Sequence, residues 1–128
     1  MSLIPDDLQY TAEHEWVRFE SDGSAVVGIT DFAQGSLGDI VYVDLAAAGS
    51  ELVAGGLCGE VESTKSVSEI YAPLAGTVEA VNDALTDAPE TVNADPYGAG
   101  WLVRLRPAEG AAEGLLDAAA YRAHVEAG

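Results

Sequence analysis

One amine stands apart in this chain, because Lys65 is the single lysine among 128 residues. It lies in the segment ESTKSV, between a strand that we expect to end near Glu62 and another that begins near Val67. A turn between two strands presents its side chains to solvent, and acylation converts an accessible lysine into a long uncharged tether. The pattern therefore suggests a site of covalent modification. The alternative is an ordinary surface lysine that opposes Glu60, Glu62 and Glu69.

Other side chains give weaker grounds for chemistry. His14 and His124 are the two histidines, and no G-x-S-x-G motif places a serine nucleophile for either of them. Neither a phosphate-binding loop nor a dinucleotide-binding fingerprint is present. Cys58 is the single cysteine, which excludes an internal disulfide and a multi-cysteine metal site, and we expect it to be a small buried side chain. We predict a protein that is not an enzyme and has no catalytic residue and no metal site.

Composition narrows the possible partners. The chain has 22 acidic and five basic residues, a formal net charge of −17. Such a surface repels nucleic-acid phosphates and anionic lipid and favours a partner with a basic docking face. No segment approaches the roughly 20 apolar residues of a membrane-spanning helix, and the N-terminal segment MSLIPDDLQY does not resemble a targeting peptide. We expect a cytoplasmic protein that binds neither nucleic acid nor membranes, with residues 1–128 forming one domain.

The elements that must position Lys65 are short strands joined by turns. We expect β-strands over residues 15–19, 24–29, 39–45, 57–62, 67–71, 77–82 and 101–105. The first two flank an Asp-Gly turn and predict a hairpin. The strand at 39–45 has an apolar pattern that indicates a well-buried position. Many short strands with regular turns predict an all-β sandwich or barrel.

Helices are expected to be few and short. Thr30 is placed to cap a helix over residues 31–37, and residues 87–93 suggest a single helical turn. Residues 115–127 have helical spacing, with Asp117 as a possible cap. Because the apolar face of this last helix is mostly alanine, it should pack on the outside of the sandwich.

Long segments of the chain resemble the glycine cleavage H-protein family. They are YTAEHEWV (10–17), VGITDFAQGSLGDIVYVDL (27–45), GEVESTKSVSEIYAPLAGTVEAVNDAL (59–85), PETVNADPYGAGWLVRL (89–105) and LLDAAAY (115–121). The match covers nearly the whole chain in one order, which is far more specific than one short motif. It implies a mostly β fold, the lipoyl/biotinyl-type β-sandwich (barrel-sandwich hybrid), with two antiparallel sheets, short helices and a C-terminal helix.

The resemblance implies that Lys65 carries lipoate in amide linkage. Glu62 lies three residues before the lysine and Gly76 eleven after it, a spacing similar to the family's lipoylation signature. Gly49 also fits the lipoyl-domain pattern. Thr64 departs from the more frequent valine, but it is a β-branched residue of similar shape.

By the same resemblance the chain is the lipoyl-bearing shuttle of a multienzyme system. A pyridoxal-phosphate glycine decarboxylase (P protein) would load an aminomethyl group onto the arm. A tetrahydrofolate-dependent aminomethyltransferase (T protein) would take the carbon, and dihydrolipoamide dehydrogenase (L protein) would receive the electrons. A lipoyl or octanoyl transferase, or a lipoate ligase, would install the arm.

The loaded arm ends in a primary amine, which is protonated near neutral pH and seeks carboxylates. Glu15 and Glu69 match family positions and are the predicted contacts for this amine, with His14 beside them. Either carboxylate is equally compatible with a solvent-facing position, and His14 with packing beside Trp16. Glu13 stands where small or polar residues also occur in the family, so it alters the surroundings of the arm.

Two alternative functions remain open. One is a lipoyl or biotin carrier domain of another complex, although the D-K-A and M-K-M turns typical of those domains are absent. The other is a β-sandwich binding protein in which Lys65 is never modified.

Overall fold

The computed structural model describes residues 3–108 and 114–127. The strands are β1 (Gln9–Tyr10), β2 (Glu15–Phe19), β3 (Ala25–Ile29), β4 (Ile40–Leu45), β5 (Glu51–Leu52), β6 (Leu57–Ser63), β7 (Val67–Tyr71), β8 (Gly76–Val81) and β9 (Val103–Pro107). The helices are α1 (Asp31–Leu37), α2 (Ala84–Asp87), α3 (Thr91–Ala94) and α4 (Ala118–Ala127).

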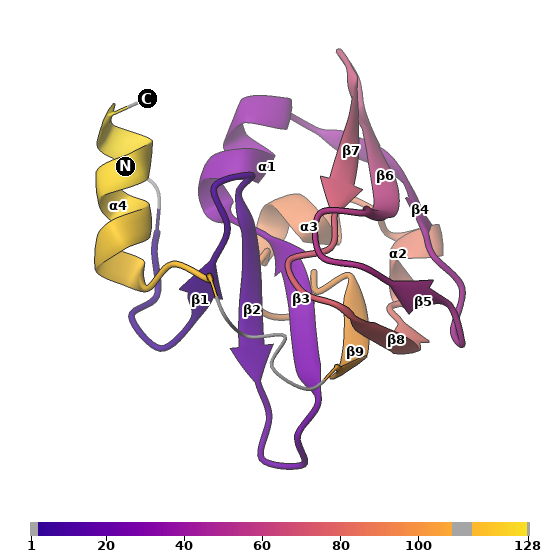
Figure 1. The fold of residues 1–128 in the computed structure, drawn as a ribbon. Coiled ribbons are helices and arrows are strands. Elements are labelled where there is room, and N and C mark those ends of the chain that lie inside the picture. The colour runs from indigo at the N-terminus through magenta and orange to yellow at the C-terminus, as the bar shows by residue number, and fades with distance from the viewer. Residues whose placement is uncertain (1–2, 109–113, 128) are drawn as a thin grey trace.

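The strands form two antiparallel sheets. The larger sheet has six strands in the order β1-β2-β3-β9-β8-β5, and the smaller has three in the order β4-β6-β7. Figure 1 shows the β6–β7 hairpin projecting from the top of the molecule, the β2–β3 hairpin from the bottom, and α4 at one side. This arrangement confirms the predicted mostly β fold with short helices and a C-terminal helix.

The main core lies between the two sheets. It includes Val17, Val27 and Leu105 from the six-stranded sheet and Val61 and Ile70 from the three-stranded sheet, all buried. Val61 lies between the exposed Glu60 and Glu62, and Ile70 follows the exposed Glu69, because successive side chains of a strand point to opposite faces. Cys58 belongs to the same core, as expected for a small buried side chain.

Several predicted elements differ from those observed. The strand over 39–45 is present as β4 but is not well buried: Ile40 is buried, whereas Val41 and Tyr42 are exposed. The reason is that β4 forms an edge of the three-stranded sheet, whose outer face meets solvent. The predicted strand over 101–105 lies two residues later, at β9.

The helical turn predicted over 87–93 is wrong in its bounds. Two short helices, α2 and α3, overlap the two ends of this range instead, and residues 88–90 between them are not helical. Ala88 ends α2 with φ −137° and ψ 62°, outside the helical region. The following Pro89 accounts for this, because a proline ring disfavours helical geometry at the preceding residue. The two-residue strands β1 and β5 were not predicted, since two residues give no periodicity.

The C-terminal helix begins at Ala118, where the Asp117 side chain accepts a hydrogen bond from the Ala120 amide at 2.8 Å. The predicted Asp117 cap is thus confirmed, and the helix lies beside β1 on the outside of the sandwich (Figure 1). The helix is anchored by Tyr121 and Ala118, while the other alanines at helical spacing, Ala119, Ala120 and Ala123, are exposed. The Tyr121 ring is fully buried and stacks on Tyr10 with centroids 4.6 Å apart. None of the helices in the described ranges is both long and apolar enough to cross a bilayer.

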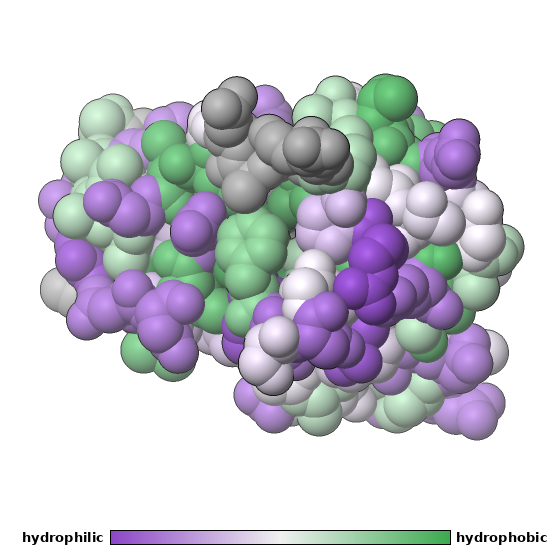
Figure 2. All heavy atoms as spheres, turned by 60° about the horizontal axis from the view of Figure 1, so that its bottom comes forward, coloured by the Kyte–Doolittle hydropathy of each residue, from purple (hydrophilic) through white to green (hydrophobic). Residues whose placement is uncertain are grey.

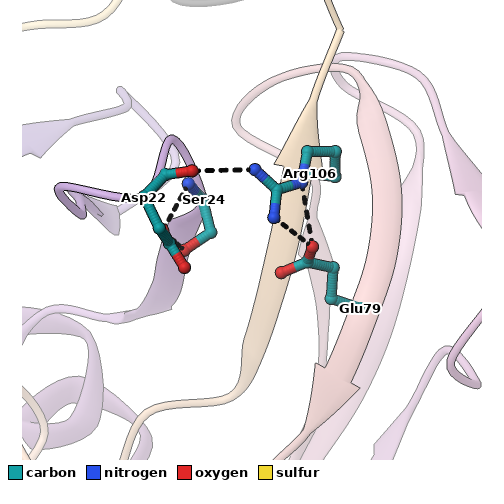
Figure 3. Close-up of polar contacts among 4 residues, drawn as sticks. All are labelled: Asp22, Ser24, Glu79 and Arg106. Atoms are coloured by element: carbon teal, nitrogen blue, oxygen red, sulfur yellow. Dashed lines mark hydrogen bonds and ion pairs between the residues drawn. The ribbon is translucent and has the colours of Figure 1, made fainter.

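The turn of the β2–β3 hairpin is tied to the sheet through Arg106 (Figure 3). Its guanidinium forms an ion pair with Glu79 at 2.6 Å and donates to the main-chain oxygen of Asp22 at 3.0 Å. The Asp22 carboxylate in turn accepts from the amide and hydroxyl of Ser24, at 2.9 and 2.6 Å. Figure 2 brings this end forward and shows hydrophilic residues interspersed with hydrophobic ones across it. The hairpin farthest from Lys65 is therefore firmly held.

Candidate functional site

Lys65 lies at the tip of the β6–β7 hairpin. The turn is closed by a hydrogen bond from the Ser63 amide to the Ser66 carbonyl at 2.8 Å. The buried Ser63 hydroxyl oxygen accepts from the amides of Lys65 and Ser66 at 3.3 and 3.1 Å. The Thr64 amide donates to the Asp39 carbonyl at 3.1 Å, which ties the turn to the start of β4. The backbone around the lysine is therefore fixed from three sides.

The Lys65 side chain itself is exposed. Within the described residues, no ion pair joins its ammonium to Glu60, Glu62 or Glu69. A Cβ built on Gly38 would lie 3.5 Å from Lys65 Cε, so the side chain passes over the end of α1. Gly38 ends that helix with φ 83°, and its amide donates to the Gln34 carbonyl. A fixed backbone combined with a free amine is what an acylating enzyme requires.

Glu62 and Gly76, which the sequence places at signature spacings, lie in different sheets. Glu62 is exposed on β6, opposite Tyr42 and Val67. Gly76 begins β8, and a Cβ on it would lie 2.5 Å from the Arg106 carbonyl oxygen. Glycine is required there because the backbones of β8 and β9 pack too closely for a side chain.

A cleft of about 150 Å³ opens between α1, β7 and the turn that precedes β2. Its apolar lining consists of Ile29, Phe32, Ala33, Leu37 and Ile70. Its polar lining consists of Glu13, His14, Ser36, Ser68 and Glu69. The structure therefore brings together His14 and Glu69, two of the predicted arm contacts, with Glu13, which was expected to alter the surroundings of the arm. It adds Phe32, which no sequence pattern singled out.

Glu15 is absent from this lining. Its side chain is buried, accepting from the Thr11 hydroxyl at 2.6 Å and from the Tyr71 amide at 3.2 Å. Burial raises the pKa of the Glu15 carboxyl, while these two hydrogen bonds partly oppose the shift. Glu15 thus links β2 in one sheet to β7 in the other, behind the wall of the cleft. Its predicted contact with the arm stays a prediction.

Glu69 lies on β7 and is exposed at the cleft, where it accepts a hydrogen bond from the Tyr71 hydroxyl at 3.2 Å. The negative charge of Glu69 raises the pKa of Tyr71. No described cation forms an ion pair with Glu69 or Glu13. Both carboxylates are therefore available to an incoming positive group.

His14 forms the opposite wall. Its Nδ1 lies 2.7 Å from the Tyr121 hydroxyl oxygen, and its ring lies 4.7 Å from the Phe32 ring and 5.5 Å from that of His124. Burial, followed by the nearby His124, lowers the pKa of His14. Packing near Trp16, the predicted alternative, is not the main environment of this imidazole. Tyr121 was missed as part of the site, although it is the single aromatic residue in an alanine-rich helical segment.

Comparisons with known proteins give one consistent result. The family model described as glycine cleavage H-protein matches residues 8–128. The chain is 58% identical to the glycine cleavage system H protein of Mycobacterium avium, with 95% of this chain and 96% of that protein covered. It is 54% identical to the H protein of Halorhodospira halophila, with 95% of each covered. The crystal structure of an H protein from Mycobacterium marinum matches with a TM-score of 0.89 and 45% identity, covering 96% of this chain and 99% of that one.

Proposed function

The chain belongs to the glycine cleavage H-protein family, the lipoate carriers of the glycine cleavage system, and on that premise we propose that Lys65 is its lipoyl attachment site. The observation that carries the proposal is the Lys65 turn itself. The single lysine of the chain sits exposed on a hairpin whose backbone is hydrogen-bonded through Ser63, without an ion pair among the described residues. The chain then acts as a carrier and not as an enzyme, and residues 1–128 form one carrier domain.

The residues near Lys65 fit a lipoyl group. A long acyl chain leaving the lysine over Gly38 meets a cleft with apolar residues from α1 and β7. Burial of these apolar groups against the arm is favourable, at about 25 cal/mol per Å². When bound, the lipoyl group supplies a disulfide that takes up an aminomethyl group and two electrons. Glu69 and Glu13 would hold the positive end of the arm, His14 would form the facing wall, and Glu15 would support that wall from behind.

Membership of the glycine cleavage system implies partner enzymes. We assign the visiting partners as glycine decarboxylase, the aminomethyltransferase and dihydrolipoamide dehydrogenase. A lipoyl or octanoyl transferase, or a lipoate ligase, would modify Lys65. The net charge of −17 supports docking on basic faces of these partners.

The test is intact-protein mass spectrometry after incubation with a lipoate ligase, ATP and lipoate. Lys65→Arg is the matched variant, because arginine keeps the positive charge and offers no acylatable amine. We expect one lipoyl increment on the wild type and none on Lys65→Arg. An unmodified wild type, in a reaction that labels a known lipoyl carrier, would favour the unmodified binding protein. Acylation by a biotin ligase and not by the lipoate ligase would indicate a biotin carrier.

A further inference from the structure

A buried chain of hydrogen bonds joins the start of α1 to the cleft through the C-terminal helix. The Tyr121 hydroxyl oxygen lies 2.8 Å from Thr30 Oγ1 and 2.7 Å from His14 Nδ1. Tyr121 and Thr30 are both fully buried. The Thr30 amide also donates to the His14 carbonyl at 3.0 Å. Three segments remote in sequence therefore meet at one imidazole.

The direction of the protons follows from the helix cap. Thr30 Oγ1 already accepts a hydrogen bond from the Ala33 amide. If Tyr121 also donated to Thr30, the threonine hydroxyl hydrogen would be buried without an acceptor among the described residues, which is costly. Both hydroxyl protons have an acceptor when Thr30 donates to Tyr121 and Tyr121 donates to His14 Nδ1. The imidazole then carries its proton on Nε2.

The backbone holds the ring in this position. His14 has φ 71°, the one positive φ of a non-glycine residue in the described part of the chain. This left-handed conformation is uncommon outside glycine, although histidine is among the residues that tolerate it best. The His124 side chain of α4 fixes the same turn, with Nε2 3.0 Å from the Ala12 carbonyl oxygen. The two anchors from α4 therefore set both the path of the turn and the orientation of His14.

We propose that α4 determines the chemistry of one wall of the cleft. Through Tyr121 and Thr30 it fixes His14 as the neutral Nε2–H tautomer. This wall then offers a hydrogen-bond donor and no positive charge to the arm on Lys65. Tyr121 is thus a positioning residue. The inference rests on the proposed function only for the arm as the occupant. A neutral wall matters because an imidazolium would repel the ammonium that the carboxylates of the cleft attract.

The charged and titratable groups around His14 act in both directions on its protonation. They are Glu13 and Glu15 on its own turn, Glu69 on β7, and Tyr121 and His124 on α4. Glu13 raises the pKa of His14, but burial and His124 act in the opposite direction and outweigh it. The residue that α1 places against the ring is the uncharged Phe32.

The test is nitrogen-15 NMR of the full-length protein, comparing wild type with Tyr121→Phe and Tyr10→Phe. Tyr10→Phe is the matched control, because it removes the hydroxyl from the other ring of the same stack, where that group donates to the Pro5 carbonyl. We expect wild-type His14 to be protonated at Nε2 and bare at Nδ1. Tyr121→Phe should lower this tautomer preference by up to about tenfold, the ratio that corresponds to one hydrogen bond. The same change should raise the pKa of His14, since Nδ1 becomes free to take a proton, whereas Tyr10→Phe should leave both quantities unchanged.

A proton on Nδ1 of His14 in the wild type would overturn the proposal, and so would an unchanged tautomer ratio in Tyr121→Phe. The wild-type spectrum tests the tautomer without any variant, so the proposal can be rejected even if Tyr121→Phe folds poorly. The arm is tested by lipoylating the wild type, which should displace the His14 Nε2–H signal. An unmoved signal on a lipoylated protein overturns the arm as occupant while the carrier function stands. A failure to lipoylate overturns the proposed function, and the tautomer assignment is judged separately from its own spectrum.

Discussion

Two hairpin turns at opposite ends of the molecule are ordered by the same kind of hydrogen bond, from a backbone amide to a side-chain oxygen. They differ in whether the basic side chain near the turn is paired. In the β2–β3 turn, a carboxylate oxygen of Asp22 accepts the Ser24 amide. In the β6–β7 turn, the hydroxyl oxygen of Ser63 accepts the Ser66 amide. In both, a side chain of the turn satisfies a backbone N–H that no strand partner reaches. Each turn is therefore ordered in part by its own residues, and contacts from Arg106 and Asp39 hold the two turns against neighbouring segments.

The difference lies in what happens to the cation near each turn. Arg106 is joined to Glu79 and to the Asp22 carbonyl, so its charge is used inside the molecule (Figure 3). Lys65 has no such ion pair among the described residues, in a chain with 22 acidic residues. The β2–β3 turn is therefore held to the sheet by its cation, whereas the β6–β7 turn leaves an amine available to an enzyme. A rigid turn and a free side chain are separate requirements, and only the Lys65 turn meets both.

The strongest way to break this comparison is to move the lysine. Ser21→Lys in a Lys65→Arg background places an exposed lysine in the β2–β3 turn. We expect no lipoyl increment by intact-protein mass spectrometry, because the ligase must recognise the β6–β7 turn and its surroundings. Wild type supplies the positive control. An increment on the moved lysine would mean that exposure alone is sufficient.

A smaller effect is expected from removing one serine hydroxyl from each turn. Ser63→Ala should slow acylation of Lys65 about fivefold and destabilise the protein by about 1 kcal/mol, since the Lys65 and Ser66 amides lose their acceptor. Ser24→Ala, at the other end, should cost a similar free energy of unfolding and leave the acylation rate unchanged. Initial acylation rates and urea unfolding curves measure the two quantities. Equal acylation rates in both variants would show that the order of the Lys65 turn is irrelevant.

The smallest effect is expected from lowering the pH, which protonates Asp22 in the β2–β3 turn. The hydrogen bonds from Ser24, with Arg106 and Arg104 nearby, lower the pKa of Asp22 from its ordinary 3.8. Because the folded state favours the carboxylate, this stabilisation is complete above pH 3.8 and is lost as the pH falls through the lowered pKa. We expect the Ser24 amide signal to keep its hydrogen-bonded position below pH 3.8 and then to shift. Asp22→Asn should abolish the transition, and a wild-type midpoint at or above 3.8 would contradict the assignment.

The strands around both turns were predictable because their signals are local. Short runs of apolar and β-branched residues on either side of Ser21–Gly23 and of Ser63–Ser66 indicate strands joined by turns, and the structure has both hairpins. Thr30 and Asp117 were recognisable as caps for the same reason. The exposure of β4 was not predictable, since its residues alternate in the same way whether or not a second layer covers its outer face.

The candidate site shows the same division. Lys65 could be singled out from residue counts and turn spacing alone, and Gly76 from the resemblance to the family's lipoylation signature. The reason that Gly76 must be glycine lies in the Arg106 carbonyl of a neighbouring strand. Glu15 and Glu69 look alike in sequence, yet one is buried between the sheets and the other lines the cleft.

The sequence by itself determined most of the Lys65 turn, because the hydrogen bonds of Ser63 close within consecutive residues. Only the tertiary structure decided the lining of the cleft. His14, Thr30 and Tyr121 meet across as many as 107 positions of the chain, and no spacing rule predicts that contact. Burial and pairing depend on which surfaces the fold brings together, so the pKa of His14 and the role of α4 follow from packing.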